Sequence, residues 1–222
     1  MIVGKAKPVE EVVDMVQGYQ RILVVGCNSC VAVCMAGGEK EVQVLASALR
    51  LAFRAKGREV QVEEAMTERQ CEVEFVDTVR DKVEKAEVVV SMACGVGPQT
   101  MARRFPDKAI YPGINTSFMG QPEELGVWSE QCGGCGDCVL DQTGAVCPIA
   151  RCSKRMLNGP CGGAQNGKCE VGNDTDCGWQ LIYDRLKAIG QLYRLEENIP
   201  ARDWRTDRDG GTRRIVREDV RA

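Results

Sequence analysis

Residues 21–34 read RILVVGCNSCVAVC, an apolar run followed at once by three cysteines. A short aliphatic and β-branched run of this kind is typical of a buried strand. The thiols of Cys27, Cys30 and Cys34 would come at the carboxyl end of that strand. Because parallel α/β sheets collect their ligands at the carboxyl ends of their strands, the stretch predicts an α/β domain with a thiol site at one sheet edge.

The residues on either side alternate between helical and strand patterns. Valines recur at helical spacing after Pro8, and Thr67 with Gln70 predicts a capping box for a later helix. We expect a small doubly wound parallel sheet with the flavodoxin-like order, in which the first and third strands are neighbours. The expected strands lie at 21–26, 60–62, 88–90 and 109–111, and the expected helices at 9–16, 42–53, 75–83 and 100–104.

The pattern changes after Phe118. Residues 120–178 are rich in glycine, hold eight cysteines and have hardly any periodic apolar run. Modules of this composition usually fold around metal centres, whose binding free energy replaces burial. A last helix, capped by Asp176, is expected at 177–195. We therefore expect an α/β domain at 1–120, a loop-dominated cysteine module with a terminal helix at 121–200, and an extended arm contacting a partner at 201–222.

Composition limits the partners and the compartment. A net charge of -3 and a pI near 5.3 give no reason to expect binding to nucleic acid. No apolar stretch approaches the roughly 20 residues of a membrane span, and the amino terminus turns acidic, so we expect a cytoplasmic protein. In that compartment thiols stay reduced, and 13 cysteines cannot all pair. Metal ligation is therefore favoured over a disulfide framework.

The spacing of the later cysteines favours iron–sulfur clusters. The thiols in CGGCGDC follow one another at two-residue gaps, as in ferredoxins, and Cys147 precedes a proline as the distant ferredoxin ligand does. Eight thiols match two 4Fe-4S clusters, whose division of ligands stays open. The alternative is one or two zinc sites with spare thiols. The eight are Cys132, Cys135, Cys138, Cys147, Cys152, Cys161, Cys169 and Cys177.

The three thiols at 27–34 need one more ligand for a third 4Fe-4S cluster. Cys94 follows the third strand, which lies beside the first in the expected order, and Cys71 is the second candidate. Two other interpretations of CNSCVAVC are a thioredoxin-like dithiol and a phosphate-binding turn; the third thiol counts against one and the missing GxGxxG spacing against the other. Without histidine or a nucleophile paired with a base, the chain yields no catalytic residue.

The chain resembles the MetV family, the small subunit or carboxyl-terminal domain associated with certain bacterial methylenetetrahydrofolate reductases. The likeness is carried by GCNSCVAVCMAGGEKEV, RQCE around Cys71, SMACGVG, YPGINTSF and CVLDQTGAVCPIARCSKRMLNGPCGGAQNGKCEV.

The resemblance implies an iron–sulfur protein that accompanies a MetF-type catalytic subunit, a flavin-carrying TIM barrel, in folate-dependent one-carbon metabolism. Flavin is expected only on that partner. Electrons would come from a donor protein such as ferredoxin or a larger redox assembly. The competing hypothesis is a zinc-stabilised module that docks the flavoenzyme without carrying electrons.

Overall fold

A four-stranded parallel sheet forms the centre of the first half of the chain in the computed structural model, which describes residues 1–221. The spatial order of the strands is β3-β2-β4-β5. The expected neighbours, the first and third strands of this sheet, do pair: Val25 lies opposite Ser91. The strands are β2 (Arg21–Cys27), β3 (Gln61–Thr67), β4 (Val88–Ser91) and β5 (Ala109–Pro112).

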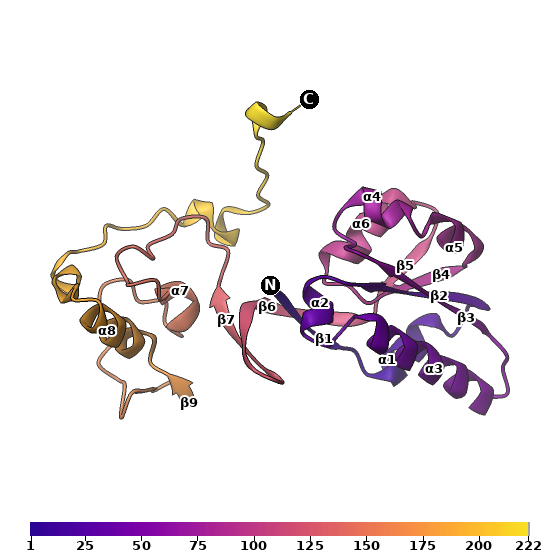
Figure 1. Ribbon diagram of the computed structural model, residues 1–222, viewed down its shortest axis with the longest axis horizontal. Helices are drawn as coiled ribbons and strands as arrows, with labels where there is room; N and C mark the ends of the chain where they lie inside the picture. Colours follow the sequence, from indigo (N-terminus) through magenta and orange to yellow (C-terminus); the bar gives the residue numbers. More distant parts are fainter. Residues whose placement is uncertain (222) are drawn as a thin grey trace. The chain divides into compact units, whose positions relative to one another are not determined.

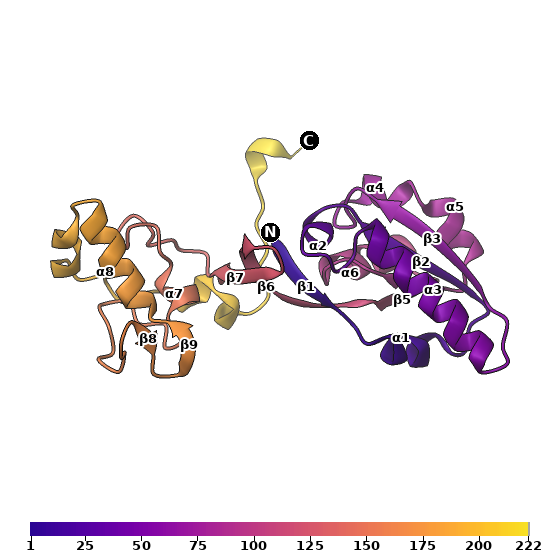
Figure 2. The ribbon, with the colours of Figure 1, turned by 60° about the horizontal axis from the view of Figure 1, so that its bottom comes forward.

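Helices cover both faces of this sheet (Figures 1 and 2). Side chains alternate along β2, so that Val24 joins the core under α1 and α3, whereas Leu23 joins the core under α4, α5 and α6. The short helix α2 carries the cysteine turn after β2. The bounds are α1 (Val9–Val16), α2 (Cys30–Val33), α3 (Glu39–Ala55), α4 (Val73–Asp77), α5 (Arg80–Lys85) and α6 (Val96–Arg104).

A second sheet, of three strands in the order β1-β6-β7, was not expected. The first strand, β1 (Ile2–Ala6), pairs antiparallel with β6 (Ile114–Glu124), and β7 (Val127–Cys132) follows. The chain divides into two compact units after Trp128, inside β7.

The expected helix at 75–83 is two helices, and the predicted capping box is wrong. Thr67 is the last residue of β3, and its hydroxyl donates to the carbonyl of Gly26 at 3.1 Å. Gln70 is fully buried: its amide donates to the carbonyls of Val25 and Gly26 at 2.9 and 3.0 Å, and it accepts from the Ser91 hydroxyl at 2.6 Å. Both side chains therefore join strand ends together rather than starting a helix.

The unit that begins at Ser129 has few regular elements. Its hydrophobic core holds Trp179, Ile182 and Leu186 of α8 (Gly178–Ala188), the longest helix of this unit, which has Cys177 at its N-cap. Asp176 makes no cap; its carboxylate pairs with Lys168 at 2.6 Å. The elements are α7 (Pro148–Arg151), β8 (Lys168–Cys169), β9 (Gly172–Asp176), α8 (Gly178–Ala188) and the 3-10 turns η1 (Leu192–Glu196), η2 (Trp204–Thr206), η3 (Arg208–Gly210) and η4 (Glu218–Val220).

No helix among residues 1–221 is both long enough and apolar enough to cross a membrane.

We predict that Gln70→Leu lowers the free energy of unfolding of the full-length chain by about 1–3 kcal/mol, because it leaves the buried Ser91 hydroxyl without its acceptor and removes one hydrogen-bond donor from each of two strand carbonyls. Urea unfolding followed by circular dichroism measures the loss. Gln43→Leu is the matched control, since Gln43 is exposed on α3. Equal urea midpoints for the two variants would contradict the prediction.

Candidate metal centres

Four thiols of the first unit belong to segments that leave the carboxyl edge of the parallel sheet. Cys27 ends β2 and Cys30 begins α2, while Cys71 follows β3 and Cys94 follows β4. Cys27 is buried, Cys30 and Cys94 are half-buried, and Cys71 is exposed. The sheet topology therefore brings both fourth-ligand candidates of the sequence to the same edge as the cysteine turn.

Gln70 fixes the segment that carries Cys71. Its side chain binds β2 through the carbonyls of Val25 and Gly26 and binds β4 through Ser91. The next residue is thus held above the ends of two neighbouring strands. The sequence pattern did not predict this role for Gln70, since a buried glutamine gives no periodic signal.

The surroundings of the Cys27 thiol shift its pKa in both directions. Burial raises the pKa of the Cys27 thiol, and the backbone N–H groups of Ser29 and Gln70 act in the opposite direction. Negative charge on Cys94 and on Cys71 raises the pKa of Cys27 further.

Cys34 faces a different environment. Its sulfur accepts a hydrogen bond from the Gly4 N–H of β1 at 3.3 Å and lies 3.6 Å from the Val31 carbonyl oxygen. The side chain is 5% exposed and belongs to the hydrophobic core beneath α1 and α3. The structure thus gives Cys34 a packing partner in β1, although the sequence placed it among the candidate ligands.

In the second unit the loop 132–138 needs two left-handed glycines. Gly134 and Gly136 have φ values of 65° and 85°, which side chains rarely tolerate. The Gly134 N–H donates to the Cys132 sulfur at 3.4 Å. Cys135 is 7% exposed, whereas Cys132 and Cys138 are exposed. This wrapped backbone offers N–H groups to sulfur, as ligand loops of iron–sulfur clusters do.

The same loop lies against the helix that begins after Cys147. A Cβ built on Gly133 would be 3.6 Å from Cγ2 of Ile149, in the middle of α7. Pro148 occupies the first position of α7, with Cys147 at its N-cap. The loop 132–138 therefore lies close to α7, which has Cys147 at its N-cap.

A second group forms where α7 ends and α8 begins. Cys152 is the C-cap of α7 and Cys177 is the N-cap of α8, and both side chains pack on the Trp179 core. The two backbones nearly touch, because a Cβ on Gly178 would lie 2.5 Å from the Arg151 oxygen and 3.0 Å from the Cys152 nitrogen.

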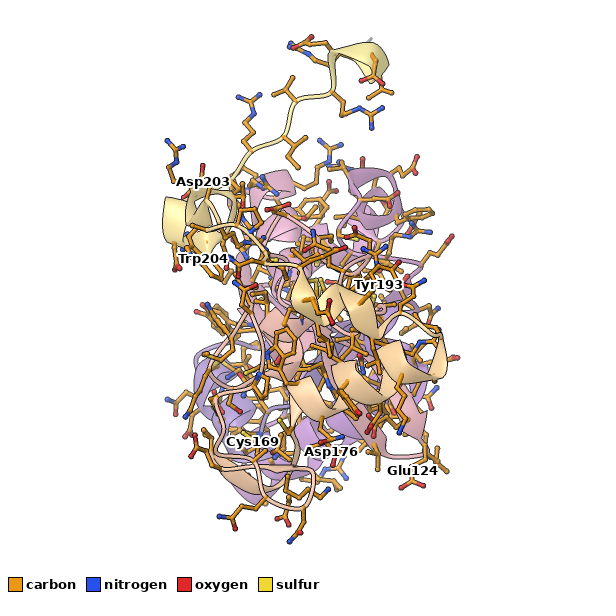
Figure 3. All side chains as sticks on the ribbon, turned by 90° about the vertical axis from the view of Figure 1, so that its left-hand side faces the viewer. Glu124, Cys169, Asp176, Tyr193, Asp203 and Trp204 are labelled. Carbon is orange, nitrogen blue, oxygen red and sulfur yellow. The ribbon has the colours of Figure 1, made fainter. Side chains whose placement is uncertain are left out.

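Of two further thiols, Cys169 lies beside Ser153, next to this junction, and Cys161 lies beside Glu170, the residue after Cys169. The Cys169 sulfur is 3.6 Å from the Ser153 hydroxyl, and the Cys161 sulfur is 3.4 Å from a carboxylate oxygen of Glu170. The N–H of Val171 and the Ser153 hydroxyl lower the pKa of Cys169, which favours its thiolate. Figure 3 marks Cys169 and Asp176 on the β8–β9 hairpin.

Several thiols thus share a sheet edge, a loop or a helix junction, but they do not form a complete set of metal ligands. Within residues 1–221, no three side chains of cysteine, aspartate or glutamate are near enough to hold one metal ion. The candidate ligands are thiols, a donor type that suits iron–sulfur clusters or structural zinc, and the Glu170 carboxylate lies beside one of them, Cys161.

We predict that Gly178→Ala destabilises the second unit by about 1–3 kcal/mol, because the added methyl group would overlap the end of α7. Thermal unfolding and the alkylation rate of Cys152 would both report the separation of α7 from α8. Gly133→Ala, whose methyl group would make only an ordinary contact, is the control. Identical behaviour of the two variants would refute the close approach.

Comparison with known proteins gives one relationship. No curated protein and no solved structure matches the chain. Residues 111–205, less than half of the chain, match the family described as "Methylene-tetrahydrofolate reductase C terminal". This segment, from β5 to the beginning of η2, is therefore related to the carboxyl-terminal region of methylenetetrahydrofolate reductases.

Proposed function

We propose that the chain is the iron–sulfur, electron-transferring partner of the flavin-containing subunit of a methylenetetrahydrofolate reductase. The relationship of residues 111–205 to the carboxyl-terminal region of such enzymes supports the choice of enzyme. The supply of thiols without any histidine supports the choice of cofactor.

The observation that carries the proposal is the grouping of the thiols. By the elements that carry them, we divide twelve of the 13 cysteines into three sets of four, and we leave out Cys34, which has its own partner in β1. Four thiolates are the complete protein ligand set of one 4Fe-4S cluster. The proposed sets are Cys27, Cys30, Cys71 and Cys94; Cys132, Cys135, Cys138 and Cys147; and Cys152, Cys161, Cys169 and Cys177.

The protein groups around each set would hold it and adjust its charge. In the first unit, Gln70 secures the position of Cys71 through β2 and β4. In the second, the Gly134 N–H already donates to the Cys132 sulfur. Bound there, iron–sulfur clusters would supply one-electron transfer. We propose that a low-potential donor protein, such as ferredoxin or a larger redox assembly, delivers the electrons and that the flavin on the partner subunit receives them.

We predict that anaerobically isolated protein contains about twelve irons and matching sulfide. Cys30→Ala should lose about a third of that iron, because it removes one ligand of the first set. Cys34→Ala is the matched control, four residues after Cys30 at the other end of α2: it should keep its iron and lose about 1 kcal/mol of stability with the Gly4 hydrogen bond. Iron analysis and unfolding midpoints separate the two effects.

An iron-free wild-type protein that still supports folate reduction by its flavin subunit would sink the electron-transfer proposal. Loss of iron from Cys34→Ala but not from Cys30→Ala would instead reassign the ligands of the first set.

A zinc site is the second candidate for one set only. The thiols of Cys152, Cys161, Cys169 and Cys177 lack the closely spaced triple found at 132–138, and Cys152 and Cys177 lie at the junction of two helices. Four thiolates are also the ligand set of tetrahedral structural zinc. A zinc ion bound by these four thiols would stabilise the module for docking to the flavoenzyme and would carry no electrons.

Zinc and iron analysis of Cys161→Ala decides between the two metals. If the third set holds a cluster, this variant loses about four irons and no zinc. If it holds zinc, the variant loses about one zinc per chain and keeps all of its iron.

A further inference from the structure

The carboxyl-terminal segment 202–213 lies on the loop 132–138 of its own unit. The carbonyl oxygen of Cys135 accepts hydrogen bonds from Arg202 at 3.2 Å and from the Thr206 hydroxyl at 2.9 Å. Arg213 donates to the carbonyl of Gly134. The sequence suggested an arm that contacts a partner, but this stretch has an intramolecular contact with a cysteine loop.

The fit between the segment and the loop is close. A Cβ on Gly136 would lie 2.6 Å from the Thr206 carbonyl oxygen, so the segment can approach only because residue 136 is glycine. Asp207, which follows Thr206, is 7% exposed. Figure 3 marks Asp203 and Trp204, the residues at which the segment turns.

Arg202 is the unusual member of this contact. One nitrogen, Nη2, binds the Cys135 carbonyl, and the guanidinium lies over the Trp204 ring at 5.2 Å from its centroid. Nε and Nη1 are buried, and neither has a hydrogen-bond partner among the described residues. Among residues 1–221, no carboxylate oxygen lies within 4.0 Å of a nitrogen of the Arg202 guanidinium. Arg202 as a whole is half-buried, but leaving these two buried donors of a cation unmet is costly unless an anion completes them.

The loop that Arg202 contacts carries three thiols, which become anionic when they bind a metal. A 4Fe-4S cluster with four thiolates carries net negative charge, and reduction adds one more negative charge. A fixed cation beside it therefore stabilises the reduced form more than the oxidised form.

We propose that Arg202 supplies the positive charge and the N–H donors that complete the metal centre held by Cys132, Cys135 and Cys138, and that it raises the reduction potential of that centre. This inference rests on the proposed function. In this proposal the segment 202–213 belongs to the centre held by the loop 132–138. Arg202 acts on the reduction potential of that centre without being one of its ligands.

The test compares anaerobically prepared full-length protein with its Arg202→Gln and Arg202→Lys variants in a redox titration followed by electron paramagnetic resonance. Arg202→Gln should lower the midpoint of one centre by about 59 mV, which is a tenfold change in the ratio of reduced to oxidised protein. The midpoint of Arg202→Lys should fall between those of wild type and Arg202→Gln, because lysine keeps the charge but not the planar set of donors. The midpoints of the other centres should not move.

Arg214→Gln is the matched control, since it removes the same charge from an exposed position of the same tail. If Arg202→Gln does not take up iron, the test rests on Arg202→Lys, whose midpoint for the same centre should still be lower than that of wild type. Midpoints for the loaded Arg202 variants equal to those of wild type and Arg214→Gln would overturn the inference but leave the proposed function standing. A wild-type protein without iron would defeat the proposed function itself.

Discussion

The second unit buries too little apolar surface to be held by packing. Of the buried hydrophobic residues among those described, 31 lie in the first unit and five in the second, where Trp179, Ile182 and Leu186 form the only cluster seen in the described residues. Loops with left-handed glycines connect elements as short as α7. Such a chain needs another source of stability, and the proposed centres would supply it through metal–thiolate bonds. The need explains why candidate ligands stand at both ends of α7 and at the beginning of α8.

The first unit is stabilised in a different way. Its sheet is covered on both faces by an aliphatic core, so it is stable through burial, and the thiols are additions at its edge. Parallel register sets their positions: Cys27 lies opposite Thr67, and Val25 lies opposite Ser91. Loops that leave neighbouring strands must then pass close together. Gln70 uses this proximity, because a single amide side chain reaches both strands.

The sequence predicted the parallel sheet well because its strands are β-branched runs that are buried on both faces. It failed wherever the decisive contact was polar and distant. The pair of Thr67 and Gln70 has the spacing of a capping box, but both side chains bind strand carbonyls instead. The antiparallel pairing of Ile2–Ala6 with β6 was missed because a five-residue strand gives little periodicity.

For the candidate sites, spacing along the chain could name the cysteines but could not tell which neighbour each one meets. Cys34 has the same local pattern as Cys30, and only the tertiary contact with Gly4 distinguishes it. The contact between the tail and Cys135 was equally invisible, since it is made by backbone carbonyls that every sequence possesses.

Each proposed set combines a thiol exposed to solvent with others that are covered. Cys71 is exposed where Cys27 is buried, and Cys138 is exposed where Cys135 lies under the tail. A purely structural metal gains nothing from an exposed ligand, whereas a centre that exchanges electrons with other proteins needs one edge near the surface and a covered side that limits solvent. Exposure and hydrogen bonds to sulfur also set reduction potential. The uneven cover over the thiols therefore fits the proposed electron transfer, and under that proposal the three sets would differ in potential.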